Sequence, residues 1–549
     1  MSTHNKFHPL KNLRYDIPAS IVVFLVAVPL CLGIALASGA PLFSGLIAGM
    51  LGGIVVGPLS KSSLGVSGPA AGLAVIVFTA IQDLGSFEVF LVAVVLAGIL
   101  QIILGFAKGG IIAYYFPNSV ILGMLAGIGV FIFLKQIPLA LGVTAEAVDA
   151  LSFDSLISGE LGSAISLVFS NVSTGAIIIT AVSLLILILW ESKFIKSKSY
   201  LSIVPGPLVA VIAGIILDIV FTGNATLQLR GDQLVQIPIS ADLGEFVSNF
   251  SLPDWSALTN FQVYITAVVI TIVASLETLL SVEATDKLDP FKRVTPANRE
   301  LKAQGVANMI SGLIGGLPIT QVIVRSSANV QSGGRTKASA VIHGFLILIS
   351  LITIAGLLNK IPLATLAAIL MLVGYKLAKP SLFRRLWSMG QRQFVPFVVT
   401  VVGIVFTDLL TGLGMGLVLA AFFILYNNYK FSYQNVKKKE KEGIHHYVIK
   451  LAHEVTFLNK ATITKTLSNI PNDSVVELDA SDTIYMDADV EEVIENFKTN
   501  ARERGIELTL IGFYRDRIKD LPDHITVIEK ENGNDEVSKE VIPPHQNKE

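Results

Sequence analysis

The sequence is poor in charged residues and in cysteine. Only 15% of its 549 positions are Asp, Glu, Lys or Arg, whereas a typical soluble protein has about 25%. Hydrophobic residues make up 52% of the chain, and the mean hydropathy is +0.66. This composition argues against a soluble enzyme and against a disordered chain. The net charge of −1 lacks the basic excess typical of nucleic-acid binding, and the single cysteine, Cys31, excludes a disulfide framework and a cysteine-based metal cluster.

The shortage of charge is confined to one part of the chain. Residues 1–430 contain 44 of the 83 charged side chains, about 10% of those positions, whereas residues 431–549 contain the other 39, about 33%. The boundary coincides with the run KKKEKE at 437–442, which an apolar environment would not accept. The sequence therefore predicts an apolar domain followed by a domain with the composition of a soluble protein.

The apolar domain contains recurring hydrophobic runs. About 20 residues of helix are needed to cross the hydrocarbon core of a bilayer. Fourteen runs are candidates, of which 66–82, 300–316 and 322–333 are short or weakly apolar. The full set is 17–38, 42–58, 66–82, 89–107, 118–135, 174–190, 203–222, 261–285, 300–316, 322–333, 338–358, 361–378, 394–410 and 412–428. We therefore expect a multi-span α-helical membrane protein with 14 transmembrane segments in residues 17–430.

Basic residues in the connections indicate an orientation. Connections on the side of the N-terminus contain 20 Lys and Arg residues, whereas the opposite side has three, Lys135, Arg230 and Lys360. Basic residues concentrate in cytoplasmic loops, and an even number of spans returns the chain to its starting side. We therefore expect an integral multi-pass membrane protein with both termini in the cytoplasm, and residues 1–16 as a cytoplasmic segment.

Two of the runs are interrupted by glycine and proline. In the third run, Ser67-Gly68-Pro69 precedes an apolar helical sequence, and in the tenth, Gly315-Gly316-Leu317-Pro318 precedes the segment 322–327. Unwound backbone is tolerated at membrane depth only where protein or water covers it. Breaks at the third position of each half of seven runs are typical of an inverted repeat whose binding site lies between the broken helices.

The starts of the two half-helices favour the binding of an anion. Their free N–H groups and helix dipoles supply positive potential without a lysine. The alternative is that the glycines only allow helices to pack closely. The predicted substrate-binding residues are Ser67, Gly68, Pro69, Ala70, Ala71, Val324, Arg325, Ser326 and Ser327.

Two ionisable residues, Glu277 and Arg325, occur in apolar surroundings, where a charge is costly and indicates function. Glu277 is predicted to hold a coupling sodium ion or proton, with Ser281 one helical turn along on the same face. Alternatively, its carboxyl group only hydrogen-bonds to nearby backbone. Arg325 is predicted to attract the anion; alternatively, its side chain snorkels to an interface or pairs with Glu277. Apart from the sodium ion, no metal or cofactor is expected.

Several stretches resemble the SulP family of inorganic anion transporters, the sulfate permeases. They are 16–20, 28–30, 67–69, 275–280, 298–301, 304–308, 315–318, 325–329 and 333–336. The resemblance implies a seven-plus-seven inverted repeat in which a core domain (spans 1–4 and 8–11) moves like an elevator against a gate domain (spans 5–7 and 12–14). It also implies that substrate lies between half-helices 3 and 10, beside the acidic residue of span 8. Many family members have Gln where Leu30 stands, so a side-chain hydrogen bond from span 1 is not expected here.

The charged tail has alternating strand and helix signals. Strand signals at 447–451, 474–479 and 507–513 flank a helix signal at 488–504, which predicts a small α/β domain. This domain, assigned to 444–530, resembles the STAS domain that follows the membrane domain in SulP proteins. A charged linker is expected at 431–443 and a disordered tail at 531–549. Related domains have a phosphorylatable serine where this chain has Asp487-Ala488-Asp489, which predicts a helix cap instead.

The combined prediction is secondary active transport of a small inorganic anion, of the sulfate or bicarbonate class, by symport with sodium or a proton. A homodimer is expected, with the STAS-like domain as a candidate interface; a purely stabilising role for that domain is equally open. The alternatives are a nucleobase permease of the same architecture, an anion channel, and a membrane-tethered signalling scaffold. The charged tail contains no P-loop, HExxH or nucleophile motif, so an enzyme is not expected.

Overall fold

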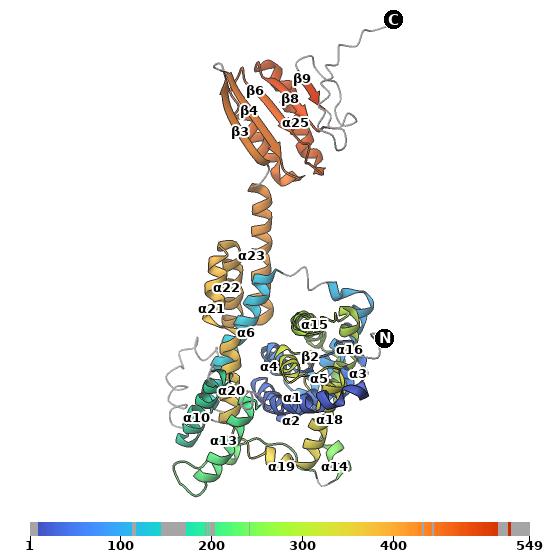
Figure 1. Ribbon diagram of the computed structural model, residues 1–549, viewed down its shortest axis with the longest axis vertical. Helices are drawn as coiled ribbons and strands as arrows, with labels where there is room; N and C mark the ends of the chain where they lie inside the picture. The colour runs from blue at the N-terminus through green and yellow to red at the C-terminus, as the bar shows by residue number, and fades with distance from the viewer. Residues whose placement is uncertain are drawn as a thin grey trace. The chain divides into compact units, whose positions relative to one another are not determined.

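The described part of the chain divides into two compact units. The computed structural model describes residues 9–111, 117–143, 172–192, 195, 197, 204–240, 242–430, 433–441, 444–513 and 525–528. The predicted tail at 531–549 and half of the predicted N-terminal segment lie outside these residues. The units are Met1–Leu417 and Val418–Glu549, each shown in Figure 1. The boundary falls within a helix, α23, and so precedes the charged run that marks it in the sequence.

A helix lies at each of the fourteen hydrophobic runs. These helices are α1 (Pro9–Ala37), α2 (Leu42–Leu51), α4 (Ala74–Leu84), α5 (Phe87–Phe106), α6 (Asn118–Ala140), α10 (Thr174–Glu191), α13 (Gly206–Phe221), α15 (Phe261–Leu288), α16 (Ala297–Leu313), α17 (Ile323–Gln331), α18 (Ala338–Thr353), α20 (Leu363–Leu377), α22 (Gln391–Phe406) and α23 (Leu409–Lys430). Within the described residues, eight helical segments are long and apolar enough to cross a membrane. Four more, including α13, α18 and α22, are apolar but shorter.

The helices of the first unit pack as two groups. In one group, α16 and α15 pack against α5, and α1 packs against α2, α17 and α18. In the other, α6 packs against α20 and α22, and α10 packs against α13 and α20. Figure 1 shows α6, α10, α13, α20 and α22 beside one another on the left of this unit. The groups adjoin along α1, which also contacts α13 and α20.

Glycines bring α5 and α16 into close contact. A Cβ atom added at Gly98 would lie 2.6 Å from the carbonyl oxygen of Gly305, and one added at Gly305 would lie 2.6 Å from the carbonyl oxygen of Gly98. Any side chain at either position would push the two helices apart. This contact holds α16 close to α5, in a position where its polar residues reach the site described below.

The second unit contains a five-stranded sheet with the strand order β3-β4-β6-β8-β9. Its elements are β3 (Tyr433–Lys441), β4 (Ile444–Leu451), β6 (Val475–Asp479), β8 (Glu507–Ile511), β9 (Ile525–Ile528) and the helices α24 (Lys460–Ser468) and α25 (Ala488–Glu503). The last four strands of the order are parallel, and apolar side chains of β4, β6 and β8 form one core with those of α24 and α25. The predicted strands and helix coincide with β4, β6, β8 and α25. Asp487 caps α25 as predicted, because its side chain accepts a hydrogen bond from the Asp489 N–H at 3.0 Å.

The predicted charged linker at 431–443 is wrong for most of its length. Tyr433–Lys441 forms β3, which pairs antiparallel with β4 and places Lys437 opposite Val448 and Lys439 opposite His446. β3 is an edge strand of the sheet. An edge strand tolerates a lysine-rich sequence because one of its edges has no partner strand, and lysines there discourage pairing with another chain. A high density of charge was therefore compatible with a regular strand.

Candidate functional site

The two interrupted runs meet through their unwound segments. β1 (Ser67–Pro69) and β2 (Ile319–Gln321) form a two-stranded antiparallel sheet, in which Ser67 is opposite Gln321 and Pro69 is opposite Ile319. Each strand leads into a helix, β1 through the 3-10 turn Ala71–Leu73 into α4, and β2 into α17. All six strand residues are buried. The predicted breaks are therefore confirmed, and two segments distant in the sequence form one structure.

Arg325 extends from the first turn of α17 to the backbone of β1. Its side chain is only 1% exposed, and its Nη2 donates to the Pro69 carbonyl oxygen at 3.4 Å. The guanidinium lies against Gly68, where any Cβ atom would collide with Nη1. Nη1 itself has no hydrogen-bond partner in the described residues. Because the side chain is buried, the interpretation that it snorkels to an interface is wrong.

Glu277 projects from α15 toward the start of the other half-helix. A Cβ atom added at Gly72 would lie 2.5 Å from Glu277 Oε2, so only glycine lets the carboxylate approach this backbone. Among the described residues, Oε2 has no hydrogen-bond partner, and Glu277 and Arg325 form no ion pair with each other. The structure thus brings one carboxylate and one guanidinium to two half-helix starts without letting them neutralise each other.

A cavity of about 240 Å³ lies at these two charged groups. The group that contains α15 and α17 contributes its polar side chains, Glu277, Ser281 and Arg325, together with Pro69, Ala71 and Gly72. The other group contributes apolar side chains, Leu125 from α6 and Val373 and Leu377 from α20. The space is large enough for a small ion with several water molecules. The cavity therefore lies between the two helix groups of the first unit.

The predicted site residues separate into two sets. Pro69, Ala71, Val324, Arg325, Glu277 and Ser281 line the cavity, whereas Ser67, Gly68, Ala70, Ser326 and Ser327 do not. The Ser67 hydroxyl accepts a hydrogen bond from Gln304 Nε2 at 2.7 Å, and the Ser326 hydroxyl accepts one from the Val66 N–H at 3.0 Å. These two hydroxyls therefore hold the strands in place. Leu30 also lines the cavity, so the wall from α1 is apolar at that position, as the sequence indicated.

Sequence reasoning missed a row of buried polar residues on α16. Gln304 Nε2 donates to the Ser67 hydroxyl of β1, and the side-chain amide of Asn308 bonds to the backbone of β2 through both its oxygen and its nitrogen. The Ile319 N–H donates to Asn308 Oδ1 at 2.5 Å, and Asn308 Nδ2 donates to the Ile319 carbonyl oxygen at 3.1 Å. Glu300, Gln304 and Asn308 are fully buried and recur every four residues, which places them on one face of the helix. That spacing was the signal available in the sequence.

Buried polar atoms without partners gather around the two strands. Within the described residues they include Glu277 Oε2, Gln304 Oε1, Thr320 Oγ1, Gln321 Oε1, Arg325 Nη1 and Asn329 Oδ1. Buried polar side-chain atoms nearly always have a partner in folded proteins, and those without one point to water, an ion or a catalytic or transport role. Of these six residues, Glu277 and Arg325 line the cavity, so their unpartnered atoms are the ones that a solute in it could reach.

A second, larger cavity of about 800 Å³ adjoins the first. It lies along the C-terminal part of α15, the following loop and the start of α6, and Leu280 lines both cavities. Its charged residues are Glu283, Asp286, Lys287, Lys292 and Arg293. This cavity therefore places charged side chains next to the first cavity, near the end of α15.

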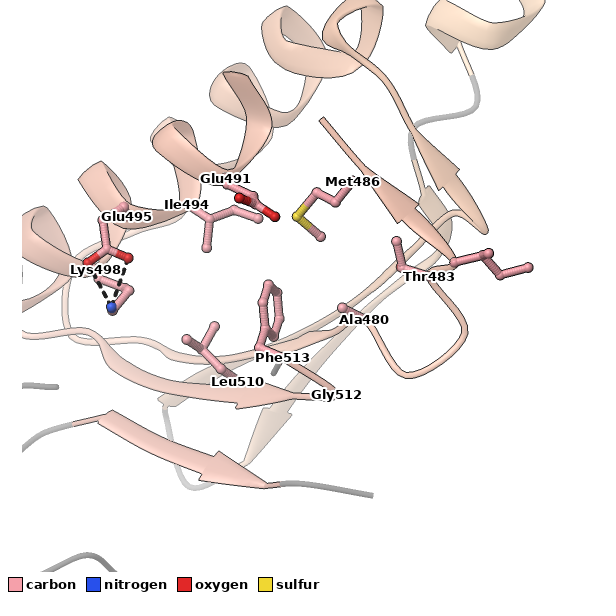
Figure 2. A pocket seen from close by; sticks show the side chains of 11 residues that line it. Ala480, Thr483, Met486, Glu491, Ile494, Glu495, Lys498, Leu510, Gly512 and Phe513 are labelled. Atoms are coloured by element: carbon pink, nitrogen blue, oxygen red, sulfur yellow. Dashed lines mark hydrogen bonds and ion pairs between the residues drawn. The ribbon is translucent and has the colours of Figure 1, made fainter. Parts of the chain in front are cut away.

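The second unit has a pocket of its own, shown in Figure 2. It lies past the ends of β6 and β8, beneath α25, and it has a volume of about 80 Å³. Figure 2 shows Ile494, Leu510 and Phe513 facing one another across it. Its buried cation, Lys498, is bound to both carboxylate oxygens of Glu495, at 2.8 and 2.9 Å. No unpartnered buried charge of this pocket is found in the described residues, in contrast to the cavity of the first unit.

Sequence comparison assigns the chain to a family. A family model described as the sulfate permease family matches residues 13–400. The chain belongs to the sulfate permease family. It is 30% identical to YvdB of Bacillus subtilis, a candidate sulfate transporter, over 76% of this chain and 75% of that protein. It is 25% identical to the bicarbonate transporter BicA of Picosynechococcus, over 76% of this chain and 71% of that protein.

Solved structures of relatives have the same fold. The transmembrane domain of a cyanobacterium bicarbonate transporter BicA matches with a TM-score of 0.61 at 25% identity, over 73% of this chain and 97% of that domain. The overall structure of SLC26A9 matches with a TM-score of 0.73 at 15% identity, over 94% of this chain and 86% of that chain, and shows the fold alone. Family membership and the apolar helices together identify an integral multi-pass membrane protein.

Proposed function

We propose that this sulfate permease family member is a secondary active transporter of a small inorganic anion, of the sulfate or bicarbonate class. The observation that carries this proposal is the buried, unpartnered Nη1 of Arg325 in a cavity where two half-helices begin. Relatives named for sulfate and for bicarbonate support the class of substrate. Pro69, Ala71, Val324 and Arg325 are the cavity-lining residues that would contact the anion.

The anion is held by backbone and by one charge. The first amides of a helix have no acceptor within it, and the aligned peptide dipoles place about half a positive charge at its start. Two such starts face the cavity, one at Ala71 and one at Ile323. Arg325 adds a full charge whose planar fork suits an oxyanion. An anion that reaches this position supplies the partner that Nη1 lacks.

Glu277 couples a cation to the anion. Its carboxylate lies in the same cavity, with Ser281 one turn further along α15. An isolated charge in low-dielectric surroundings is unfavourable, so a sodium ion or a proton at Glu277 stabilises the loaded site. The carboxylate and the Ser281 hydroxyl are oxygen donors, which suit sodium. The cavity then gains a cation together with the anion, which is the basis of symport.

Movement of one helix group against the other supplies alternating access. The cavity lies between the two groups, with the two strands and both charges carried by the group of α1, α5, α15 and α16. We propose that this group is the moving core and that the group of α6, α20 and α22 is the fixed gate. The fourteen helices then form two inverted repeats of seven, with both termini in the cytoplasm. The larger cavity at the end of α15 is the cytoplasmic approach.

Uptake by the purified protein in proteoliposomes tests this function. Radiolabelled sulfate and bicarbonate are offered with the sodium gradient and the pH gradient set separately. We expect accumulation of one of these anions above equilibrium, driven by one of the two gradients. Flux that only follows the anion's own gradient would indicate a channel, and uptake that uracil inhibits would indicate a nucleobase permease. Either result would overturn the proposal.

A further inference from the structure

A short amphipathic helix joins α20 to α22. This helix, α21 (Pro380–Ser388), presents one apolar face to the protein. Leu386 is 2% exposed and belongs to a core cluster with Ala126 of α6 and Phe397 of α22. The Phe383 ring packs edge-on against the Phe397 ring, with 4.9 Å between centroids. These contacts fix α21 to the helix group that we propose as the gate.

The other face of α21 is basic and aromatic, and it is exposed. Lys379, Arg384 and Arg385 are exposed and form no ion pair within the described part of the chain. No Asp or Glu occurs between Glu300 and Asp408 in the sequence, so no carboxylate that is close to them in the sequence balances them. The nearby Lys376 differs, because it pairs with Glu191 of α10.

α21 lies at the end of an apolar segment. It completes the segment Leu363–Ser388, which is long enough to cross a membrane, and α22 begins three residues later, so the chain turns back at α21, where it reaches the surface of the bilayer. Trp387 is 68% exposed and Met389 55% exposed, beside the exposed arginines. The Trp387 ring is held edge-on against Phe394 at 4.8 Å. Exposed tryptophan next to basic residues is typical of helices that lie in the headgroup region.

We propose that α21 binds the phosphate headgroups of anionic phospholipids through Lys379, Arg384 and Arg385, while Trp387 enters the boundary between headgroups and acyl chains. Each arginine can bind a phosphate group through two parallel hydrogen bonds, so two adjacent arginines on the exposed face suit phosphate headgroups. The consequence is an anchor that holds the gate helices at a fixed depth while the other group moves. This inference goes beyond the proposed function and holds whichever anion is carried.

Lipid binding by the full-length purified protein tests the proposal without measuring transport. Native mass spectrometry compares retention of phosphatidylglycerol with that of phosphatidylcholine. The test variant is Arg384→Gln/Arg385→Gln. The control, Arg230→Gln/Lys360→Gln, also removes two exposed positive charges, from connections at other helices, although Arg230 pairs with Asp232. We expect the preference for phosphatidylglycerol to fall on the order of 10-fold in the test variant only. An equal preference in the test variant and in the wild type would overturn the proposal.

Two further measurements identify what covers this face. Brominated phosphatidylglycerol in proteoliposomes is expected to quench a component of the tryptophan fluorescence that is absent from Trp387→Phe. A quenching profile that is the same with and without Trp387 would contradict the placement of α21. Efficient disulfide cross-linking of Arg384→Cys between two chains would show that a second copy covers the face, and would likewise overturn binding to lipid.

Discussion

Arg325 in the first unit and Lys498 in the second are both buried cations, with exposed fractions of 1% and 2%. Lys498 has its own partner three residues away, because Glu495 binds it with both carboxylate oxygens (Figure 2). Arg325 has a long contact to the Pro69 carbonyl oxygen and lies beside the buried Cys31 thiol, but its Nη1 has no hydrogen-bond partner among the described residues. Burying an uncompensated charge costs several kcal/mol, so such a group persists where function needs it.

The comparison distinguishes a structural charge from a functional one. The Lys498–Glu495 pair is complete within one helix and can stabilise α25 without any ligand. The Arg325 site is incomplete, and its surroundings contain further unpartnered atoms and a cavity. An anion would supply the partner that Arg325 lacks in the first unit, whereas in the second unit it would have to displace Glu495 from Lys498. Substitutions at Arg325, Glu277, Asn308 and Glu495 test this distinction.

Arg325→Ala is expected to raise the KM for anion uptake by about 10- to 100-fold, because a hydrogen bond to a charged group contributes about 1.5–3 kcal/mol. Arg325→Lys keeps the charge but not the fork, and its KM should lie between those of Arg325→Ala and the wild type. The measurement is initial uptake in proteoliposomes. Lys498→Met is the matched control, and it should transport like the wild type. A wild-type KM in Arg325→Ala would show that this cation does not serve the substrate.

Glu277→Gln is expected to remove the cation dependence of uptake, because the amide keeps the shape of the side chain but cannot hold a positive ion or release a proton. Ser281→Ala should have a smaller effect in the same direction, since it removes one neutral oxygen donor. Uptake at graded sodium concentrations and at graded external pH measures both variants. Full cation dependence in Glu277→Gln would refute the coupling role.

Asn308→Ala is expected to lower the free energy of unfolding by about 2–4 kcal/mol, because it leaves the buried N–H and carbonyl groups of Ile319 without partners. Asn308 then no longer holds β2, the strand that leads into α17. Because α17 carries Arg325, the KM for anion uptake should rise several-fold. Gln304→Ala removes one hydrogen bond, the one to the Ser67 hydroxyl, so it should change the free energy of unfolding and the KM less than Asn308→Ala does. Thermal unfolding in detergent and uptake kinetics provide the two readouts. An Asn308→Ala protein with wild-type unfolding temperature and KM would exclude a supporting role for α16.

Glu495→Ala is expected to destabilise the second unit by about 1–2 kcal/mol, because it converts Lys498 into an unpartnered buried cation like Arg325; the half-exposed position of Glu495 limits the effect. Lys498→Met leaves only the half-exposed carboxylate of Glu495 without its partner, so it should destabilise the second unit less than Glu495→Ala does. Hydrogen exchange of β6 and β8 in the full-length protein measures both. Equal protection in the two variants would mean that the pair is not a stabilising one.

Much of the architecture could be predicted from the sequence, because the relevant signals are local. Hydrophobic runs located the helices, and glycine with proline located the breaks at β1 and β2. Polar residues in apolar context singled out Glu277 and Arg325. These features depend on backbone chemistry and on the cost of burying charge, which act wherever the chain lies in space.

The remaining features depend on tertiary contacts. Ser67 was predicted to bind substrate, but its hydroxyl is hydrogen-bonded to Gln304, which lies more than 200 residues away in the sequence. The burial of Lys498 was not evident in a tail whose average composition is that of an exposed surface. The strand at Tyr433–Lys441 was hidden by its lysines, because edge strands do not follow the hydrophobic alternation of central strands.

The most direct test of the central claim is binding of the anion to the purified protein in detergent. Titration of sulfate and of bicarbonate, followed by thermal unfolding, should stabilise the wild type and Lys498→Met equally, and should require about 10- to 100-fold more anion for the same stabilisation of Arg325→Ala. Stabilisation follows from binding to the folded state alone. Equal stabilisation of Arg325→Ala and the wild type by the same anion would contradict the account, because the unpartnered guanidinium would then not be the anion's site.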